Sequence, residues 1–113
     1  MGIDALKERL ENEASAGDIV NAGKTANALR TVLYGNIYVV HDIPELMISA
    51  YVHHAKNQFA GGKVREALQT LAAGARNYGD SPEIKSLQER YAPLAEQSER
   101  ASSLDQGAPR TSP

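Results

Sequence analysis

The sequence predicts an all-α fold, a stack of antiparallel helical hairpins with about five helices. Apolar residues recur at steps of three and four along most of the chain, which is the spacing of one face of an α-helix. Two segments of similar sequence begin at Gly23 and Gly62, and a fixed period of this size is typical of stacked helical units. No stretch alternates between apolar and polar residues as a half-buried strand would.

Each expected helix has one apolar stripe, which marks the face that should be buried. In chain order, the stripes are Ile3, Leu6, Leu10 and Ala14 in the first helix; Leu29, Val32, Leu33, Ile37 and Val40 in the second (25–40); Ile48, Tyr51, Val52, Ala55 and Phe59 in the third (45–60); Val64, Ala67, Leu68, Leu71 and Ala75 in the fourth (63–78); and Ile84, Leu87, Tyr91 and Leu94 in the fifth (83–97). Pro93 lies inside the last helix and is expected to kink it or to end it early.

Two turn signals each occur twice. The segments GKTANALRTVLYG (23–35) and GKVREALQTLAAG (62–74) share G-K-x-x-x-A-L-x-T-[VL]-x-x-G, and D-x-P-E occurs at 42–45 and at 80–83. A glycine can end one helix and allow a tight reversal, and a proline followed by an acidic residue favours the first turn of the next helix. We therefore expect each GK pair to open a helix and each D-x-P-E segment to connect two helices.

Composition indicates one small domain without covalent cross-links. The chain has 113 residues and no cysteine, which excludes disulfides and thiolate metal sites. A chain of this length buries roughly 65% of the surface that its unfolded form exposes, enough for a stable core. We expect a helical domain over residues 1–97. Residues 98–113 are rich in Ser, Pro, Gly and charge, and we expect them to form a disordered tail.

A helix, a short glycine turn and a second helix with G-x-x-x-x-A-L-x-x-L resemble the tetratricopeptide repeat (TPR) family. Gly62, Ala67 and Leu71 match the motif positions of that family. The spacing of the last stripe matches the start of a following repeat. The resemblance covers roughly residues 18–97, with a period of 38–39 residues where about 34 is usual. It implies a right-handed stack that acts as a protein-interaction scaffold, an adaptor or a chaperone-like module.

Motifs for catalysis or cofactor binding are weak. A phosphate-binding loop needs G-x-x-x-x-G-K-[ST] between a strand and a helix, but Asp18 occupies the position of its first glycine. His53 and His54 are adjacent, so they point about 100° apart on a helix and cannot easily share a metal ion. His41 is expected in a turn, and no serine has an obvious base. We expect no cofactor, no bound metal and no enzymatic activity.

The first candidate surface for a partner protein lies on the expected second helix. Tyr34 and Tyr38 fall one turn apart and away from its apolar stripe. Tyrosine is favoured at interfaces because it offers a large, rigid surface with a polar tip. The alternative is that this face packs on a neighbouring helix. A homo-oligomer formed through an uncapped end of the stack is a further possibility.

The second candidate surface is the polar face of the expected third helix, which includes His53, Lys56 and Asn57. In the family that the chain resembles, the first helix of each hairpin lines a groove that binds peptides. The resemblance therefore implies that these residues, with Arg90 of the last helix, contact a partner peptide. A face that is simply solvated is the alternative.

A small helical DNA-binding regulator is the alternative function. TANALRTVLYGN would then be a recognition helix, with Lys24, Asn27 and Arg30 reaching the bases. However, the chain has 12 Lys and Arg against 14 Asp and Glu, and only residues 24–76 are mildly basic, with six against three. This charge distribution argues against a nucleic-acid partner, which generally needs a dense basic face.

The sequence gives no sign of a membrane segment. No run of about 18 apolar residues occurs. The N-terminal segment MGIDALKERLENE is acidic and amphipathic, unlike a signal peptide with its basic and then apolar regions. We expect a cytoplasmic protein without a membrane partner, unless the chain is one domain of a longer protein.

Overall fold

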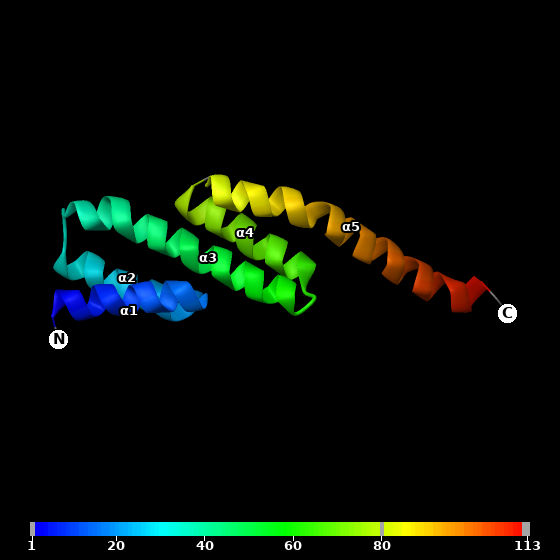
Figure 1. Cartoon of the computed structure of the whole chain (residues 1–113), viewed down its shortest axis with the longest axis horizontal. Coiled ribbons are helices and arrows are strands. Elements are labelled where there is room, and N and C mark those ends of the chain that lie inside the picture. The colour runs from blue at the N-terminus through cyan, green and yellow to red at the C-terminus, as the bar shows by residue number, and fades with distance from the viewer. Residues whose placement is uncertain (1, 80, 112–113) are drawn as a thin grey trace.

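The computed structural model describes the backbone of residues 2–79 and 81–111 and the side chains of residues 2–79 and 81–97. Five α-helices follow one another (Figure 1): α1 (Ile3–Ala16), α2 (Ile19–Val32), α3 (Ile43–Ala60), α4 (Val64–Tyr78) and α5 (Pro82–Thr111). A π-helical turn, Tyr38–Asp42, leads directly into α3. No strand occurs in the residues described. The all-α prediction with about five helices is confirmed.

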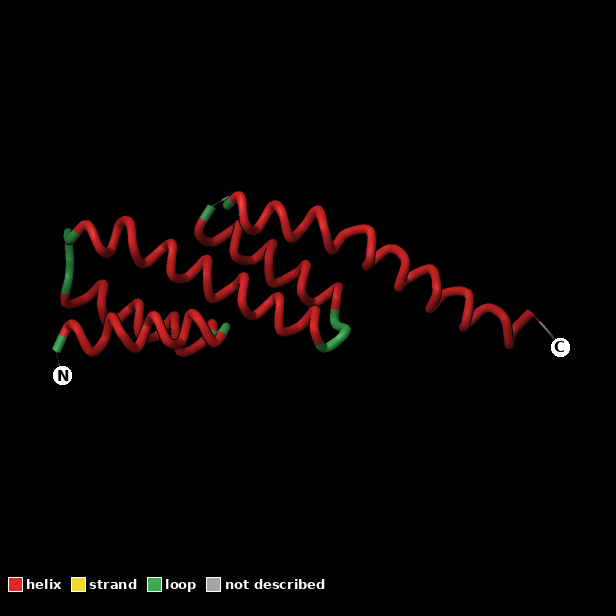
Figure 2. Tube along the Cα trace, viewed as in Figure 1, coloured by secondary structure: helices red, strands yellow, loops and turns green. Residues whose placement is uncertain are grey.

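The helices pack as two antiparallel hairpins, α1–α2 and α3–α4, followed by α5 (Figure 2). Helix α3 packs on both helices of the first hairpin, and α5 packs mainly on α4. One buried cluster joins α1, α2, the π-helical turn and the first half of α3. A second cluster joins the later part of α3 with α4 and α5. Helix α3 contributes to both clusters and therefore holds the two halves together.

The turn of the first hairpin lies directly on the backbone of α3. Gly17 ends α1 with φ +73°, and a Cβ atom at this position would lie 2.7 Å from the backbone nitrogen of His54. Asp18 then caps α2, because its carboxylate accepts a hydrogen bond of 3.2 Å from the backbone N–H of Asn21. Helix α2 consequently begins at Ile19. The expectation that Gly23 opens this helix is wrong.

The turn of the second hairpin has the expected form. Gly62 has φ +83° and lies just before α4, whose first residue is Val64. This GK pair opens a helix, whereas the first pair lies inside α2. The two copies of the GK motif therefore occupy different places in their hairpins.

The two hairpins correspond to each other at a shift of 45 residues instead of 39. This shift places Gly62 on Gly17, the two hairpin-turn glycines with positive φ. In this alignment, fully buried residues of one hairpin correspond to fully buried residues of the other: Ala22 to Ala67, Ala26 to Leu71, and Leu10 to Ala55. The same face of each helix is therefore buried in both hairpins.

The predicted second helix is interrupted. Helix α2 ends at Val32, and a turn follows in which Gly35 has φ +79° and the side-chain oxygen of Asn36 accepts a hydrogen bond of 2.9 Å from the backbone N–H of Tyr38. Of the predicted stripe, Leu29 is buried and Leu33 is half-buried, but its remaining three residues are exposed: Val32, Ile37 and Val40.

The two D-x-P-E segments also differ. Asp42 is the last residue of the π-helical turn that continues into α3, so the first segment does not connect two separate helices. In the second segment, α5 begins at Pro82, and the hydroxyl of Ser81 accepts a hydrogen bond of 3.3 Å from the backbone N–H of Glu83. Asp80 lies outside the described residues. Only the second segment forms the expected connection.

Helix α5 is longer than predicted. Its backbone continues past Pro93 to Thr111, because proline removes one hydrogen bond but the flanking segments can remain helical. The principal-axis extents are 67 × 24 × 17 Å, and Figure 1 shows the last part of α5 running beyond the other helices. Composition predicted a disordered tail over residues 98–113, whereas residues 98–111 continue this helix in the structure. Ser112 and Pro113 lie outside the described residues. The domain boundary at residue 97 stays a prediction.

Candidate interaction surface

Four large apolar side chains are exposed where the chain passes from α2 to α3. The exposed fractions are 55% for Val32, 93% for Tyr34, 79% for Ile37 and 74% for Val40. We call these four residues the apolar patch. They come from the end of α2, the connection and the π-helical turn, which lie at one end of the molecule (left in Figure 1). Soluble proteins seldom gather exposed apolar side chains in this way unless the surface binds something.

The second hairpin provides an internal comparison for this surface. At the shift of 45 residues, the patch positions correspond to Asn77, Gly79, Pro82 and Lys85, all of which are exposed. The equivalent passage from α4 to α5 thus forms without large apolar side chains. The fold itself does not require the apolar residues of the patch.

Tyr38, which lies between patch residues, is directed into the protein. Its side chain is only 8% exposed, and the Nζ atom of Lys7 lies 4.5 Å from the centre of its ring. The Tyr38 hydroxyl has no hydrogen-bond partner within the described part of the chain. Burial raises the pKa of Tyr38, and the carboxylates of Glu11 and Asp42 raise this pKa further. Tyr38 therefore fixes the π-helical turn against α1, which leaves the patch side chains facing outward.

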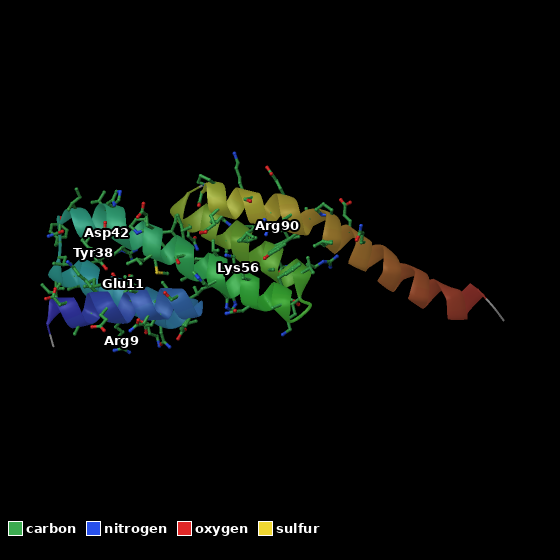
Figure 3. All side chains as sticks on the ribbon, viewed as in Figure 1. Arg9, Glu11, Tyr38, Asp42, Lys56 and Arg90 are labelled. Atoms are coloured by element: carbon green, nitrogen blue, oxygen red, sulfur yellow. The ribbon has the colours of Figure 1, made fainter. Side chains whose placement is uncertain are left out.

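The charges beside the patch are mainly negative. Glu11, Asp42 and Glu45 are exposed, and Figure 3 shows Glu11 and Asp42 at the same end as Tyr38. His41 Nδ1 lies 2.9 Å from the Asp42 carboxylate. The pKa of His41 is raised by this hydrogen bond and, to a smaller extent, by Glu45.

The nearby cations are partly covered by contacts within the chain. Lys7 is half-buried over the ring of Tyr38. Arg30 is also half-buried, and its Nη1 donates a hydrogen bond of 2.7 Å to the side-chain oxygen of Asn27. The exposed charge around the apolar patch is therefore carried largely by carboxylates.

Tyr34 and Tyr38, which were predicted to share one face, do not lie together. Tyr34 belongs to the exposed patch and Tyr38 to the buried core, because the turn at Gly35 separates them. The apolar residues beside Tyr34 were missed as surface residues, since the apolar spacing of a helix runs unbroken through this turn. The Gly35–Asn36 pair is a turn signal that marks the interruption.

The predicted groove face of α3 is partly covered. Asn57 Nδ2 donates a hydrogen bond of 3.4 Å to the carbonyl oxygen of Ala16, in the turn of the first hairpin. His53 is half-buried, and its Nδ1 lies 2.8 Å from the carbonyl oxygen of Ser49. Lys56 on α3 and Arg90 on α5 are exposed (Figure 3). A role for these four residues in binding a partner stays a prediction.

The predicted DNA-reading residues lie on α2. Lys24 and Asn27 are exposed, and Arg30 is bonded to Asn27. Helix α1, which packs against α2, has four carboxylates against two cations: Asp4, Glu8, Glu11 and Glu13 against Lys7 and Arg9. No dense basic face is formed on this hairpin, as nucleic-acid binding generally requires.

Within the residues described, no helix is both long and apolar enough to cross a membrane. The same residues contain no group of three or more His, Cys, Asp or Glu side chains that could hold a metal ion. Comparisons with known proteins found no matching family model, no matching curated protein and no matching solved structure.

Proposed function

We propose that this protein is a non-catalytic protein-interaction module that binds a helix or peptide of a partner protein through the apolar patch. The supporting observation is the exposure of Val32, Tyr34, Ile37 and Val40 at positions where the second hairpin has small or polar residues or proline. Exposed apolar side chains of this kind are typical of the centre of an interface, which is more apolar than its polar rim.

The arrangement of the helices supports a scaffold role. Helix α3 packs on both helices of the hairpin before it, as expected for stacked hairpin repeats. The correspondence at 45 residues supports an internal repeat, although this period is longer than the roughly 34 residues usual for TPR units. We extend the proposal to an adaptor or chaperone-like role on this basis. Such stacks bind partners through surface side chains without chemistry of their own.

An affinity pull-down from native lysate tests the proposed function. We compare the wild type with the patch variant Tyr34→Ser/Ile37→Ser and with the control Asn77→Ser/Lys85→Ser, which changes two exposed residues of the second hairpin that correspond to Val32 and Val40. A partner protein that is lost with the patch variant and retained with the control is the expected result. If the partner protein is lost with the groove variant Lys56→Glu/Arg90→Glu but retained with the patch variant, the binding surface is the predicted groove instead.

Two other outcomes would contradict the proposal. Recovery of the same proteins by the wild type, the patch variant and the groove variant would show that neither surface binds them. Recovery that disappears after nuclease treatment would favour the DNA-binding alternative, in which Lys24 and Arg30 contact the nucleic acid.

A further inference from the structure

We infer that the apolar patch binds a cationic amphipathic helix, a partner segment with apolar residues on one face and Lys or Arg beside them. This inference rests on the proposed function and adds the chemistry of the partner. It follows from two features that occur together at this end of the molecule: exposed apolar side chains and exposed carboxylates beside them.

The exposed carboxylates beside the patch outnumber the imidazole that lies among them. Glu11, Asp42 and Glu45 are exposed, and the imidazole of His41 lies 2.9 Å from the Asp42 carboxylate and 3.9 Å from that of Glu45. Lys7 is held over the Tyr38 ring. Three carboxylates against one imidazole leave an excess of negative charge even when His41 is protonated, and a partner that brings Lys or Arg side chains next to its apolar face would meet this charge. Such complementarity speeds association and selects among partners.

The same charges argue against a second copy of this chain as the occupant. In a two-fold symmetric dimer, the same surface of both copies forms the interface. The excess negative charge beside the patch of one copy would then face the same excess on the other copy, and like charges placed across an interface weaken association. An anionic membrane surface would be repelled for the same reason.

The apolar patch offers several exposed side chains to a helical ligand. Ile37 and Val40 are both exposed and lie three residues apart where the chain enters the π-helical turn that leads into α3. Val32 and Tyr34 add apolar surface from the other side of the connection. A short amphipathic helix with anchors at i, i+3 or i+4, and i+7 presents a row of apolar side chains to such a surface.

Two synthetic helical peptides test the inference. Both have the same row of leucines on one face, and the flanking positions are all lysine in one peptide and all glutamate in the other. We measure the dissociation constant of each peptide by fluorescence anisotropy at low and at high salt. The protein variants are the patch variant Tyr34→Ser/Ile37→Ser, the charge variant Glu11→Gln/Glu45→Gln, and the matched control Glu83→Gln/Glu89→Gln, which removes the same charge elsewhere.

The lysine peptide is expected to bind at least about tenfold more tightly than the glutamate peptide, with a preference that falls as salt screens the charges. The charge variant should weaken binding of the lysine peptide about 3–10-fold, since rim charges are each worth up to about 1 kcal/mol. The matched control should change it less than about twofold. The patch variant should abolish saturable binding of the lysine peptide.

The other outcomes separate the inference from the proposed function. Equal binding of both peptides that still depends on the patch would overturn the inference and leave the proposed function intact. Equal binding of the lysine peptide to the wild type and the patch variant would overturn both. If neither peptide binds, and sedimentation shows a dimer that the patch variant loses, the occupant is a second copy. If neither peptide binds, and the wild type but not the patch variant binds neutral phosphatidylcholine vesicles, the occupant of the patch is a lipid surface.

Discussion

The hydroxyl of Thr25 donates a hydrogen bond of 2.5 Å to the carboxylate of Glu13, across the turn of the first hairpin. The same contact recurs in the second hairpin, where the hydroxyl of Thr70 donates a bond of 2.6 Å to the side-chain oxygen of Gln58. In both cases the partners are twelve residues apart. A contact repeated in the same place in two hairpins indicates that each uses it to fix the register of its two helices.

The two threonine contacts should differ in strength. Thr25→Val removes a partly buried hydrogen bond to a carboxylate and should lower the free energy of unfolding by about 1.5–3 kcal/mol. Thr70→Val removes a bond to a neutral amide and should cost about 0.5–1.5 kcal/mol. Urea denaturation of both variants measures the difference, with Thr25→Ser as the control that keeps the hydroxyl. A smaller loss for Thr25→Val than for Thr70→Val would contradict the assignment.

Gly17 should tolerate a side chain less well than Gly35. Both have positive φ, but a Cβ atom at Gly17 would lie 2.7 Å from a backbone nitrogen of α3, and one at Gly35 would meet no atom within 4 Å. Gly35→Ala should cost about 1–2 kcal/mol through backbone conformation alone. Gly17→Ala should cost more than about 4 kcal/mol, or prevent folding, because the first hairpin must move off α3. Thermal unfolding followed by circular dichroism compares them, and equal losses would show that the close approach does not exist.

Tyr38 should make the protein sensitive to alkaline pH. The raised pKa means that the folded state holds the phenol proton more tightly than the unfolded state. This stabilisation is complete below the unfolded pKa of about 10 and is lost as pH rises through the higher pKa of the folded state. Tyr38→Phe should reduce the loss of stability that urea denaturation records between about pH 9 and pH 11.

The same substitution should increase stability at neutral pH. It removes a buried hydroxyl that has no partner in the described structure, a group that costs about 1–3 kcal/mol when left unsatisfied. The exposed Tyr34 serves as the control, and Tyr34→Phe should leave stability at neutral pH unchanged. A loss of stability in Tyr38→Phe would show that the hydroxyl has a partner, such as a bound water molecule.

The sequence predicted the second half of the fold better than the first. In α4 and α5, the glycine before α4, the Ser-Pro start of α5 and most of both apolar stripes agree with the structure, although Leu94 of the last stripe is exposed. The 39-residue repeat of the GK motif predicted the wrong start for α2, because the two GK segments resemble each other in sequence but occupy different places in their hairpins. The 45-residue correspondence of the structure aligns Gly62 with Gly17. The role of Gly17 comes from its close approach to α3, a segment distant in sequence. Single-sequence patterns do not show such contacts.

The candidate site was only partly predictable for a related reason. Tyr34 was identified as a surface residue, but Val32, Ile37 and Val40 continue the spacing of Leu29 and so were expected in the core. Apolar periodicity does not show whether a helix is interrupted. Here the turn at Gly35 rotates the chain after α2, and residues that would have been buried on a continuous helix become exposed.

Leu29 and Ile37, which belong to one predicted stripe, should therefore respond differently to truncation. Leu29 is fully buried between helices, so Leu29→Ala removes packed atoms, leaves a cavity and should cost about 2–5 kcal/mol. Ile37 is exposed, so Ile37→Ala should change the free energy of unfolding by less than about 0.5 kcal/mol. Urea denaturation of the two variants measures both values. Similar large losses would mean that α2 continues through Gly35 and buries Ile37, and the apolar patch with its proposed partner would then have no structural basis.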